Sequence, residues 1–258
     1  MECYRLTKQA IAKVFVEYYQ NLLGKKEYGR EIANAGLLRQ GTILNTEEQL
    51  MLVQAYTQNE VKDAMFSIDI NKSLGLDRYG SGFFRAAWSI VGPDGTQAVL
   101  EYLGNGRLLN QMNATIIFLI PKVEAPVLAS QFRPIACCNV IYKCISKMIC
   151  ARLRKVIAVI VANNQAVFIE GRSLIHNVLI CHDLLRHCKR KTTPRCLMKI
   201  DLKKAYDMVS WEVIEDVLKG YGFPSSFVQL VMNCVTITKF TIKLNGVGYG
   251  YFKGRRGL

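Results

Sequence analysis

The chain has 258 residues, of which 50% are hydrophobic, and a formal net charge of +14 at pH 7. A chain of this length can bury a sizeable core as one large or two small domains, and its longest apolar runs, residues 116–120 and 156–162, are too short to cross a bilayer. The positive charge favours a polyanionic partner, with nucleic acid as the first candidate, although a solvated basic surface would give the same count.

The nine cysteines are odd in number and show no paired spacing. We therefore expect free thiols in a reducing compartment, which indicates an intracellular protein of the nucleus or the cytoplasm. The N-terminus shows no apolar signal region, so no membrane partner is expected. Because no Cys-x2-Cys pair occurs, no zinc site is expected among His176, Cys181, His182, His187, Cys188 and Cys196.

The first hundred residues are expected to be mainly helical. Apolar residues recur at helical spacing over residues 8–23, where Gly24 ends the run, and residues 25–42 read as a loop. Two further helices are expected to begin at capping boxes, formed by Thr46 with Gln49 and by Thr57 with Glu60. The Pro-Asp-Gly sequence at residues 93–95 is expected to break the chain before a helix through residues 98–103.

Two strands and a long helix are expected in the middle of the chain. Residues 114–123 read as a buried strand that Pro121 ends, and residues 131–136 form a second strand after a loop. Residues 139–160 have an apolar stripe at helical spacing. The polar positions of this helix are basic: Lys143, Lys147, Arg152, Arg154 and Lys155.

A helix from Ser173 leads to a short buried strand over residues 197–200, and Asp201 stands where that strand is expected to end. A carboxylate held at a strand end suits a hard divalent cation, which prefers oxygen ligands, although such an acid is more often a helix cap or a turn residue. Basic residues crowd around it, as in a site that handles phosphates: Arg186, Lys189, Arg190, Lys191, Arg195, Lys199, Lys203 and Lys204.

The rest of the chain is expected to form two helices and a hairpin. The helices cover residues 211–219 and 227–234. The hairpin strands cover residues 238–244 and 249–253, and an Asn-Gly turn joins them.

Six motifs then follow one another along the chain. They are Asn-Lys-Ser-x-Gly-x-Asp at residues 71–77, Ile-Pro-Lys at 120–122, Phe-Arg-Pro-Ile at 132–135, Tyr-Lys-x2-Ser-Lys-x4-Arg-Leu at 142–153, Gln-x2-Phe-x2-Gly-Arg at 165–172 and Asp-x2-Lys-Ala-Tyr-Asp-x-Val at 201–209. Their succession resembles the reverse transcriptase domain of plant LINE-type (non-LTR) retrotransposons. The shared order is far more specific than any one motif.

This resemblance implies an α+β fold of the right-hand polymerase type. Residues 1–110 would form a helical N-terminal extension that leads into the fingers, and residues 111–258 would form reverse transcriptase-like fingers and a partial palm. The implied reaction is RNA-directed DNA synthesis, in which a primer 3′-hydroxyl attacks a deoxynucleoside triphosphate and two Mg²⁺ ions clamp the reacting oxygens. The implied partners are an RNA template, a DNA primer and deoxynucleoside triphosphates.

The resemblance also implies the catalytic residues. Asp201 would bind Mg²⁺ together with the backbone carbonyl of Leu202. Tyr206 would pack under the incoming sugar and exclude a 2′-hydroxyl. Asp207 is not a metal ligand in the family and reads as a turn or helix-entry acid.

Further residues would hold the nucleotide and the template. Lys122 and Arg133 would grip the triphosphate, Arg133 as a bidentate fork and Lys122 as a point charge. A basic helix face is more often solvated, but beside a template channel that of the helix over residues 139–160 would follow phosphates. The template path would be shaped by Gln165, Phe168, Gly171 and Arg172, with Arg172 on a phosphate.

The sequence departs from the family in two respects. Leu74, Leu76 and Arg78 stand where the family has Pro, Pro and Gly, so the turn at these residues is expected to be less rigid. No aromatic-x-Asp-Asp motif occurs, and in the family the residues around Gly257 lead into a second catalytic block, Arg-Gln-Gly-Asp-Pro. We therefore expect a chain truncated before the second and third catalytic blocks, which binds Mg²⁺ weakly and does not polymerise DNA. The alternatives are a non-catalytic nucleic-acid-binding module and the unselected product of a degenerate retroelement.

Overall fold

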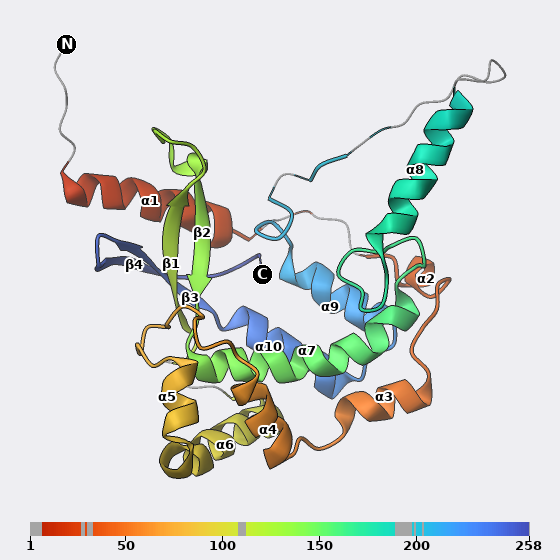
Figure 1. The fold of residues 1–258 in the computed structure, drawn as a ribbon, viewed down its shortest axis with the longest axis horizontal. Helices are drawn as coiled ribbons and strands as arrows, with labels where there is room; N and C mark the ends of the chain where they lie inside the picture. The colour runs from red at the N-terminus through yellow and green to blue at the C-terminus, as the bar shows by residue number, and fades with distance from the viewer. Residues whose placement is uncertain are drawn as a thin grey trace.

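The computed structural model describes residues 7–26, 29, 33–107, 112–188, 198, 200–202 and 204–257, and Figure 1 shows their mixed α and β structure. The helices are α1 (Lys8–Leu23), α2 (Ala35–Leu38), α3 (Thr46–Val53), α4 (Gln58–Phe66), α5 (Ser81–Ala86), α6 (Trp88–Asn105), η1 (Ala129–Gln131), α7 (Val140–Ile160), α8 (Leu174–Cys188), α9 (Trp211–Gly220) and α10 (Ser225–Thr236). The strands are β1 (Ala114–Pro121), β2 (Phe132–Cys137), β3 (Lys239–Leu244) and β4 (Val247–Lys253).

The strands form one sheet with the order β2-β1-β3-β4. β1 pairs antiparallel with β2 and parallel with β3, and β4 returns antiparallel to β3. Successive side chains of a strand point to opposite faces of the sheet. Ile117, Ile242 and Phe252 therefore lie on one face, where they pack against Tyr19 and Leu23 of α1. We call this the covered face.

A larger apolar core surrounds α7. Cys144, Ile145 and Ile149 of α7 pack with Met65 of α4 and Val99 of α6, and α9 and α10 complete the same core. The helices that precede residue 110 thus share a core with those that follow it. The domain boundary expected at residues 110/111 remains a prediction.

Most of the expected elements are confirmed to within one or two residues. The loop expected over residues 25–42 was wrong in part, because it contains α2, and two expectations on helices were also wrong. α3 is capped one residue earlier than expected, because Asn45 and Glu48 form the capping box, with Glu48 N donating to Asn45 Oδ1 at 2.9 Å. The Thr57–Glu60 capping box is confirmed. Pro93 does not break the chain but lies inside α6, which continues to Asn105 although the proline lacks a helical N–H donor.

The turn around residue 78 forms without the prolines and the glycine of the family pattern. Arg78 adopts a left-handed backbone with φ of 63°, and its N–H donates to the carbonyl of Gly75 at 3.2 Å. Gly75 itself lies against Asn139, where an added Cβ would be 2.5 Å from the Asn139 Cα. The turn therefore depends on a close approach at Gly75 and carries backbone strain at Arg78.

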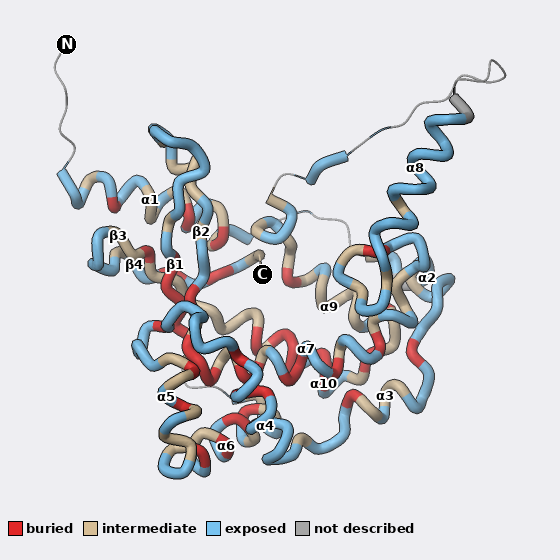
Figure 2. The backbone as a smooth tube through the Cα atoms, viewed as in Figure 1, coloured by how far each residue is buried: buried red, intermediate tan, exposed pale blue. Residues whose placement is uncertain are grey.

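α8 extends away from the rest of the molecule, and Figure 2 shows almost its whole length as exposed. Its exposed residues include Ile175, Val178 and Leu179. Within the described part of the chain, no helix combines the length and the apolar character that a membrane span requires.

Candidate functional site

The β1–β2 pair brings Lys122 and Arg133 together. Arg133 lies opposite Ile120, and Lys122 N donates to the carbonyl of Gln131 at 2.8 Å. Opposite residues of an antiparallel pair share a face, and so do residues two apart along one strand. Lys122 and Arg133 are therefore diagonal neighbours on the face that α1 does not cover. Lys122 Nζ also donates to the carbonyl of Ser130 at 3.1 Å, whereas the exposed Arg133 guanidinium has no hydrogen bond or ion pair with any described residue.

The same face continues onto β3 and β4. Lys243 lies opposite Phe118, and its Nζ is 5.3 Å from the centroid of that ring. Lys239 Nζ is likewise 5.3 Å from the ring centroid of Tyr251, which is 59% exposed. We call this surface the open face; it comprises Phe118, Ile120, Lys122, Arg133, Ile135, Lys239, Lys243 and Tyr251. Cations and exposed aromatic rings alternate across it, which is the combination that binds single-stranded nucleic acid.

The template-binding residues expected at 165–172 lie in one compact loop. Phe168 is 85% exposed, and its ring meets that of Tyr206 edge-on at 6.4 Å. Gly171 adopts a φ of 78°, and Gln165 Nε2 makes only a 3.4 Å contact with the carbonyl of Val167. Phe168 and Gln165 thus face solvent, and the structure brings Phe168 to the expected sugar-binding residue.

Arg172 has a different role from the expected phosphate contact. Its guanidinium donates to the carbonyls of Ala158, Val161, Ala162 and Gln165 at 2.7–3.0 Å. These carbonyls lie at and just beyond the C-terminal end of α7, where backbone acceptors lack helical partners. In this arrangement Arg172 is occupied by the backbone, so its role is to close the helix end.

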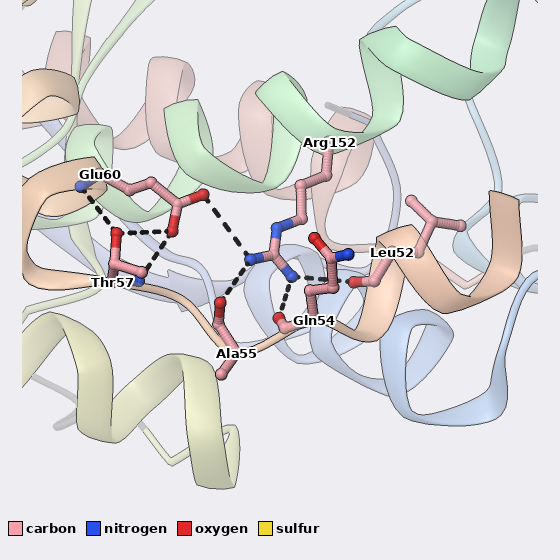
Figure 3. Close-up of polar contacts among 6 residues, drawn as sticks. All are labelled: Leu52, Gln54, Ala55, Thr57, Glu60 and Arg152. Atoms are coloured by element: carbon pink, nitrogen blue, oxygen red, sulfur yellow. Dashed lines mark hydrogen bonds and ion pairs between the residues drawn. The ribbon is translucent and has the colours of Figure 1, made fainter. Parts of the chain in front are cut away.

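The basic face expected on α7 is also largely structural. Arg152 is 6% exposed and donates to the carbonyls of Leu52, Gln54 and Ala55, as Figure 3 shows. Its guanidinium carbon also lies 3.4 Å from the ring centroid of Tyr56, and Nη2 is 3.7 Å from Glu60 Oε1. The expectation that Arg152 follows template phosphates is therefore wrong, because the loop before α4 surrounds it.

Two lysines of α7 also donate hydrogen bonds to backbone carbonyls. Lys147 Nζ donates to the carbonyl of Ser67 at 2.8 Å, and Lys143 Nζ donates to the carbonyl of Ser73. Arg154 and Lys155 are exposed, and within the described residues Arg154 pairs with the carboxylate of Glu170, at 3.7 Å. Three of the five basic residues on α7 thus hold the segment between Leu52 and Ser73.

Asp201 lies on an exposed segment, and the buried strand expected before it is not present in the described residues. Met198 and Ile200 are 75% and 73% exposed and outside any strand, and Leu202 is 72% exposed. A strand needs a hydrogen-bonded neighbour, and no described strand pairs with this segment. Leu197 and Lys199 lie outside the described residues, as do Lys189, Arg190, Lys191, Arg195 and Lys203 of the expected basic cluster.

The described residues around Asp201 do not complete a metal site. No three His, Cys, Asp or Glu side chains gather anywhere within the described part of the chain. Asp201 therefore presents a single exposed carboxylate, next to the carbonyl of Leu202. No contact within the described structure joins Asp201 to Lys122 or to Arg133.

The residues after Asp201 return to the sheet. Met208 N donates to the carbonyl of Lys204 at 3.1 Å, and Asp207 lines a cavity of about 230 Å³ together with Tyr142, Trp211 and Arg256. The indole N–H of Trp211 donates to the carbonyl of Gly257 at 2.7 Å. Sequence reasoning missed Trp211 and Arg256, since neither belongs to a motif whose partner could be read along the chain.

The described cysteines are free, as expected: Cys137, Cys138, Cys144, Cys150, Cys181 and Cys234. Burial raises the pKa of the Cys144 thiol to about 12. That thiol is therefore neutral at physiological pH and serves the core as a small apolar group.

The chain is similar in sequence to a known protein family and to proteins of two transposable elements. Residues 120–256, more than half of the chain, match the family described as reverse transcriptase (RNA-dependent DNA polymerase). The chain is 28% identical to an uncharacterised 149 kDa protein of transposon TX1 from Xenopus laevis, over 73% of this chain and 14% of that protein. It is 27% identical to the retrovirus-related Pol polyprotein of the type-2 retrotransposable element R2DM from Drosophila melanogaster, over 56% of this chain and 13% of that polyprotein. The chain thus spans about one seventh of the length of either relative.

Proposed function

We propose, because the chain belongs to the reverse transcriptase (RNA-dependent DNA polymerase) family, that it handles template and nucleotide in the RNA-directed DNA synthesis of a non-LTR retrotransposon. The observation that carries the proposal is the open face of the sheet. Its cations would contact RNA phosphates, and the exposed rings of Phe118 and Tyr251 would stack with bases.

The nucleotide would bind at the end of the same face. Arg133 offers a planar fork without a competing partner among the described residues, and Lys122 adds a point charge beside it. Tyr206 would support the sugar, and its contact with Phe168 would connect the sugar site to the template loop. Gln165 and Gly171 would shape that loop.

The family uses divalent metal ions, which supply charge neutralisation for the transferring phosphoryl group. Asp201 and the carbonyl of Leu202 are the ligands that this chain would contribute. They do not fit a closed Mg²⁺ site by themselves, because a lone exposed carboxylate replaces few of the waters that Mg²⁺ holds.

Crosslinking tests the proposed RNA surface. An RNA that carries 4-thiouridine should crosslink to peptides containing Phe118 and Tyr251 when it is irradiated with the purified chain. Phe118→Ala should remove the first of these crosslinks and leave the second. Crosslinks confined to α7 or α8 would contradict the open face as the binding surface.

A non-catalytic nucleic-acid-binding role is the second candidate, and the isolated carboxylate of Asp201 favours it for the 258-residue polypeptide. This polypeptide contains no aromatic-x-Asp-Asp motif, so we expect it to bind RNA without extending a primer. Primer extension on an RNA template should match an Asp201→Asn control. Extension above that control would show that other residues of the polypeptide complete the metal site.

A further inference from the structure

α1 touches three segments of the part of the chain that matches the family, although it lies outside that part itself. Two of these segments lie next to proposed nucleotide-binding residues. The first is the start of β2. The rings of Phe15 and Phe132 meet edge-on at 5.0 Å, and the hydroxyl of Tyr19 lies 3.4 Å from the carbonyl of Phe132. Phe132 is on the covered face, so Arg133, the next residue, must point to the open face.

The second segment follows Asp201. Lys204 Nζ donates to the hydroxyl of Tyr18 and lies 4.7 Å from the centroid of its ring. Lys204 adopts a left-handed backbone with φ of 53°, which is unfavourable for a residue with a Cβ. The contact with Tyr18 thus holds the side chain of a residue that lies two positions before Tyr206.

The third segment is the end of the described chain. The backbone N–H groups of Arg255 and Arg256 donate to the carbonyl of Leu23 at 2.7 and 3.2 Å, and Arg256 Nε donates to the carbonyl of Leu22 at 2.6 Å. These carbonyls belong to the last turn of α1, which has no helical donors for them. Lys26, just after α1, pairs with Glu212 of α9 at 2.9 Å.

We propose that α1 is a positioning element for the nucleotide site, and the proposal rests on the proposed function. Tyr18 holds the backbone that leads to Tyr206 and so sets the discrimination between deoxyribose and ribose. Phe15 and Tyr19 hold Phe132 and so direct Arg133. The competing interpretation is a helix that only buries apolar surface on the sheet and has no effect on nucleotide selectivity.

Hydrogen exchange separates these interpretations. Tyr18→Phe keeps the ring and removes only the hydroxyl that accepts from Lys204. The amide of Met208, which donates to the carbonyl of Lys204, should exchange about three- to ten-fold faster in this variant, the range expected from one lost hydrogen bond. The amide of Lys239, which donates to Asn113, should not change.

Matched variants control this measurement. Lys204→Met should reproduce the faster exchange, and the double variant should add little to it, because both changes remove the same contact. Tyr251→Phe also removes one tyrosine hydroxyl, but on the open face, and should leave Met208 unchanged. An unchanged Met208 amide in both Tyr18→Phe and Lys204→Met would overturn the proposal.

Nucleotide selectivity supplies the second test. The parent chain and Tyr18→Phe would each be mixed with an RNA template, a dideoxy-terminated primer and Mg²⁺, and the Kd values of dGTP and GTP would be compared. We expect the preference for dGTP to fall about three- to ten-fold in Tyr18→Phe. If α1 had a purely structural role, Tyr18→Phe would weaken the binding of dGTP and GTP by the same factor. An unchanged ratio of the two Kd values would therefore overturn the role of Tyr18 in selectivity. If the parent chain bound neither nucleotide, the proposed function would be contradicted. The exchange of the Met208 amide would then show by itself whether α1 positions the segment before Tyr206.

Discussion

α7 and the sheet are both rich in basic residues, but their cations are used differently. On α7, Lys143, Lys147 and Arg152 donate to backbone carbonyls of the segment between Leu52 and Ser73. On the open face, Lys239 and Lys243 lie over exposed rings. Arg133 has no polar partner among the described residues.

The difference follows from the backbone around each group. The loops that connect helices leave carbonyls without intrahelical donors, and a nearby lysine or arginine satisfies them. The strands of a sheet pair their carbonyls with one another, so Arg133, Lys239 and Lys243 find no free acceptor in the strands. Lys122, just beyond the end of β1, is the exception, because it reaches the carbonyl of Ser130 in η1. The charge of a basic side chain on the open face is therefore available to bind a polyanion, whereas most of the basic side chains on α7 stabilise the fold.

The largest expected effect concerns Arg152. Arg152→Met would remove the buried donor to the carbonyl of Leu52 and the part-buried donors to those of Gln54 and Ala55, which should lower the free energy of unfolding by about 3 kcal/mol. Urea unfolding measures this. Arg154→Met, a neighbour on the same helix with one exposed ion pair, should cost less than about 1 kcal/mol. Equal losses of unfolding free energy in the two variants would contradict the structural role assigned to Arg152.

A gain in stability is expected in the turn that Lys143 anchors. Arg78→Gly should raise the free energy of unfolding by about 1 kcal/mol, because glycine accepts the left-handed φ without strain. Lys72→Gly, in the preceding turn from Asp69 and at an ordinary φ, should lower it by about 0.5–1 kcal/mol. If Arg78→Gly is the less stable of the two in thermal unfolding, α7 does not hold a strained turn.

The smallest expected effect is an acid dependence at the edge of the covered face. The hydroxyl of Ser210 and the ammonium of Lys26 lower the pKa of Glu212 to about 2. A depressed folded-state pKa gives stability that is present above the unfolded-state pKa and is lost as the pH falls through the folded value. The loss should therefore lie between about pH 4.5 and 2, and Glu212→Gln should flatten the stability profile in this window. Glu215→Gln, which removes an i,i+4 pair with Lys219 on the same helix, serves as the control. Identical profiles for the parent and Glu212→Gln would contradict this role.

The sequence predicted most of the strands and helices because apolar periodicity decides both, but it missed the short helices α2 and α5. The resemblance to the family also implied that Lys122 and Arg133 act at one site, and the antiparallel pairing of β1 with β2 brings them together. It could not predict that Arg152 is buried, because the carbonyls that surround it come from residues about 100 positions earlier. It could not predict the exposed state of Met198 and Ile200 either, since an apolar run forms a strand only where a neighbouring strand can pair with it.

The sequence could not predict the contacts of α1 either. The apolar stripe of residues 8–23 predicted a helix with one buried face, but the stripe does not say which element it meets. Tyr18 and Lys204 are separated by 186 positions, and only the return of the chain through the sheet brings them together. The same holds for Arg256 and the end of α1.

The salt dependence of RNA binding tests the division between α7 and the sheet most directly. The slope of log K against log salt falls by about 0.7 for each cation that contacts a single-stranded phosphate, so Lys239→Met with Lys243→Met should reduce the slope by about 1.4. Lys147→Met with Arg154→Met removes the same charge from α7 and should leave the slope unchanged. A slope that falls equally in both double variants, or only in the α7 variant, would contradict the assignment of RNA binding to the open face.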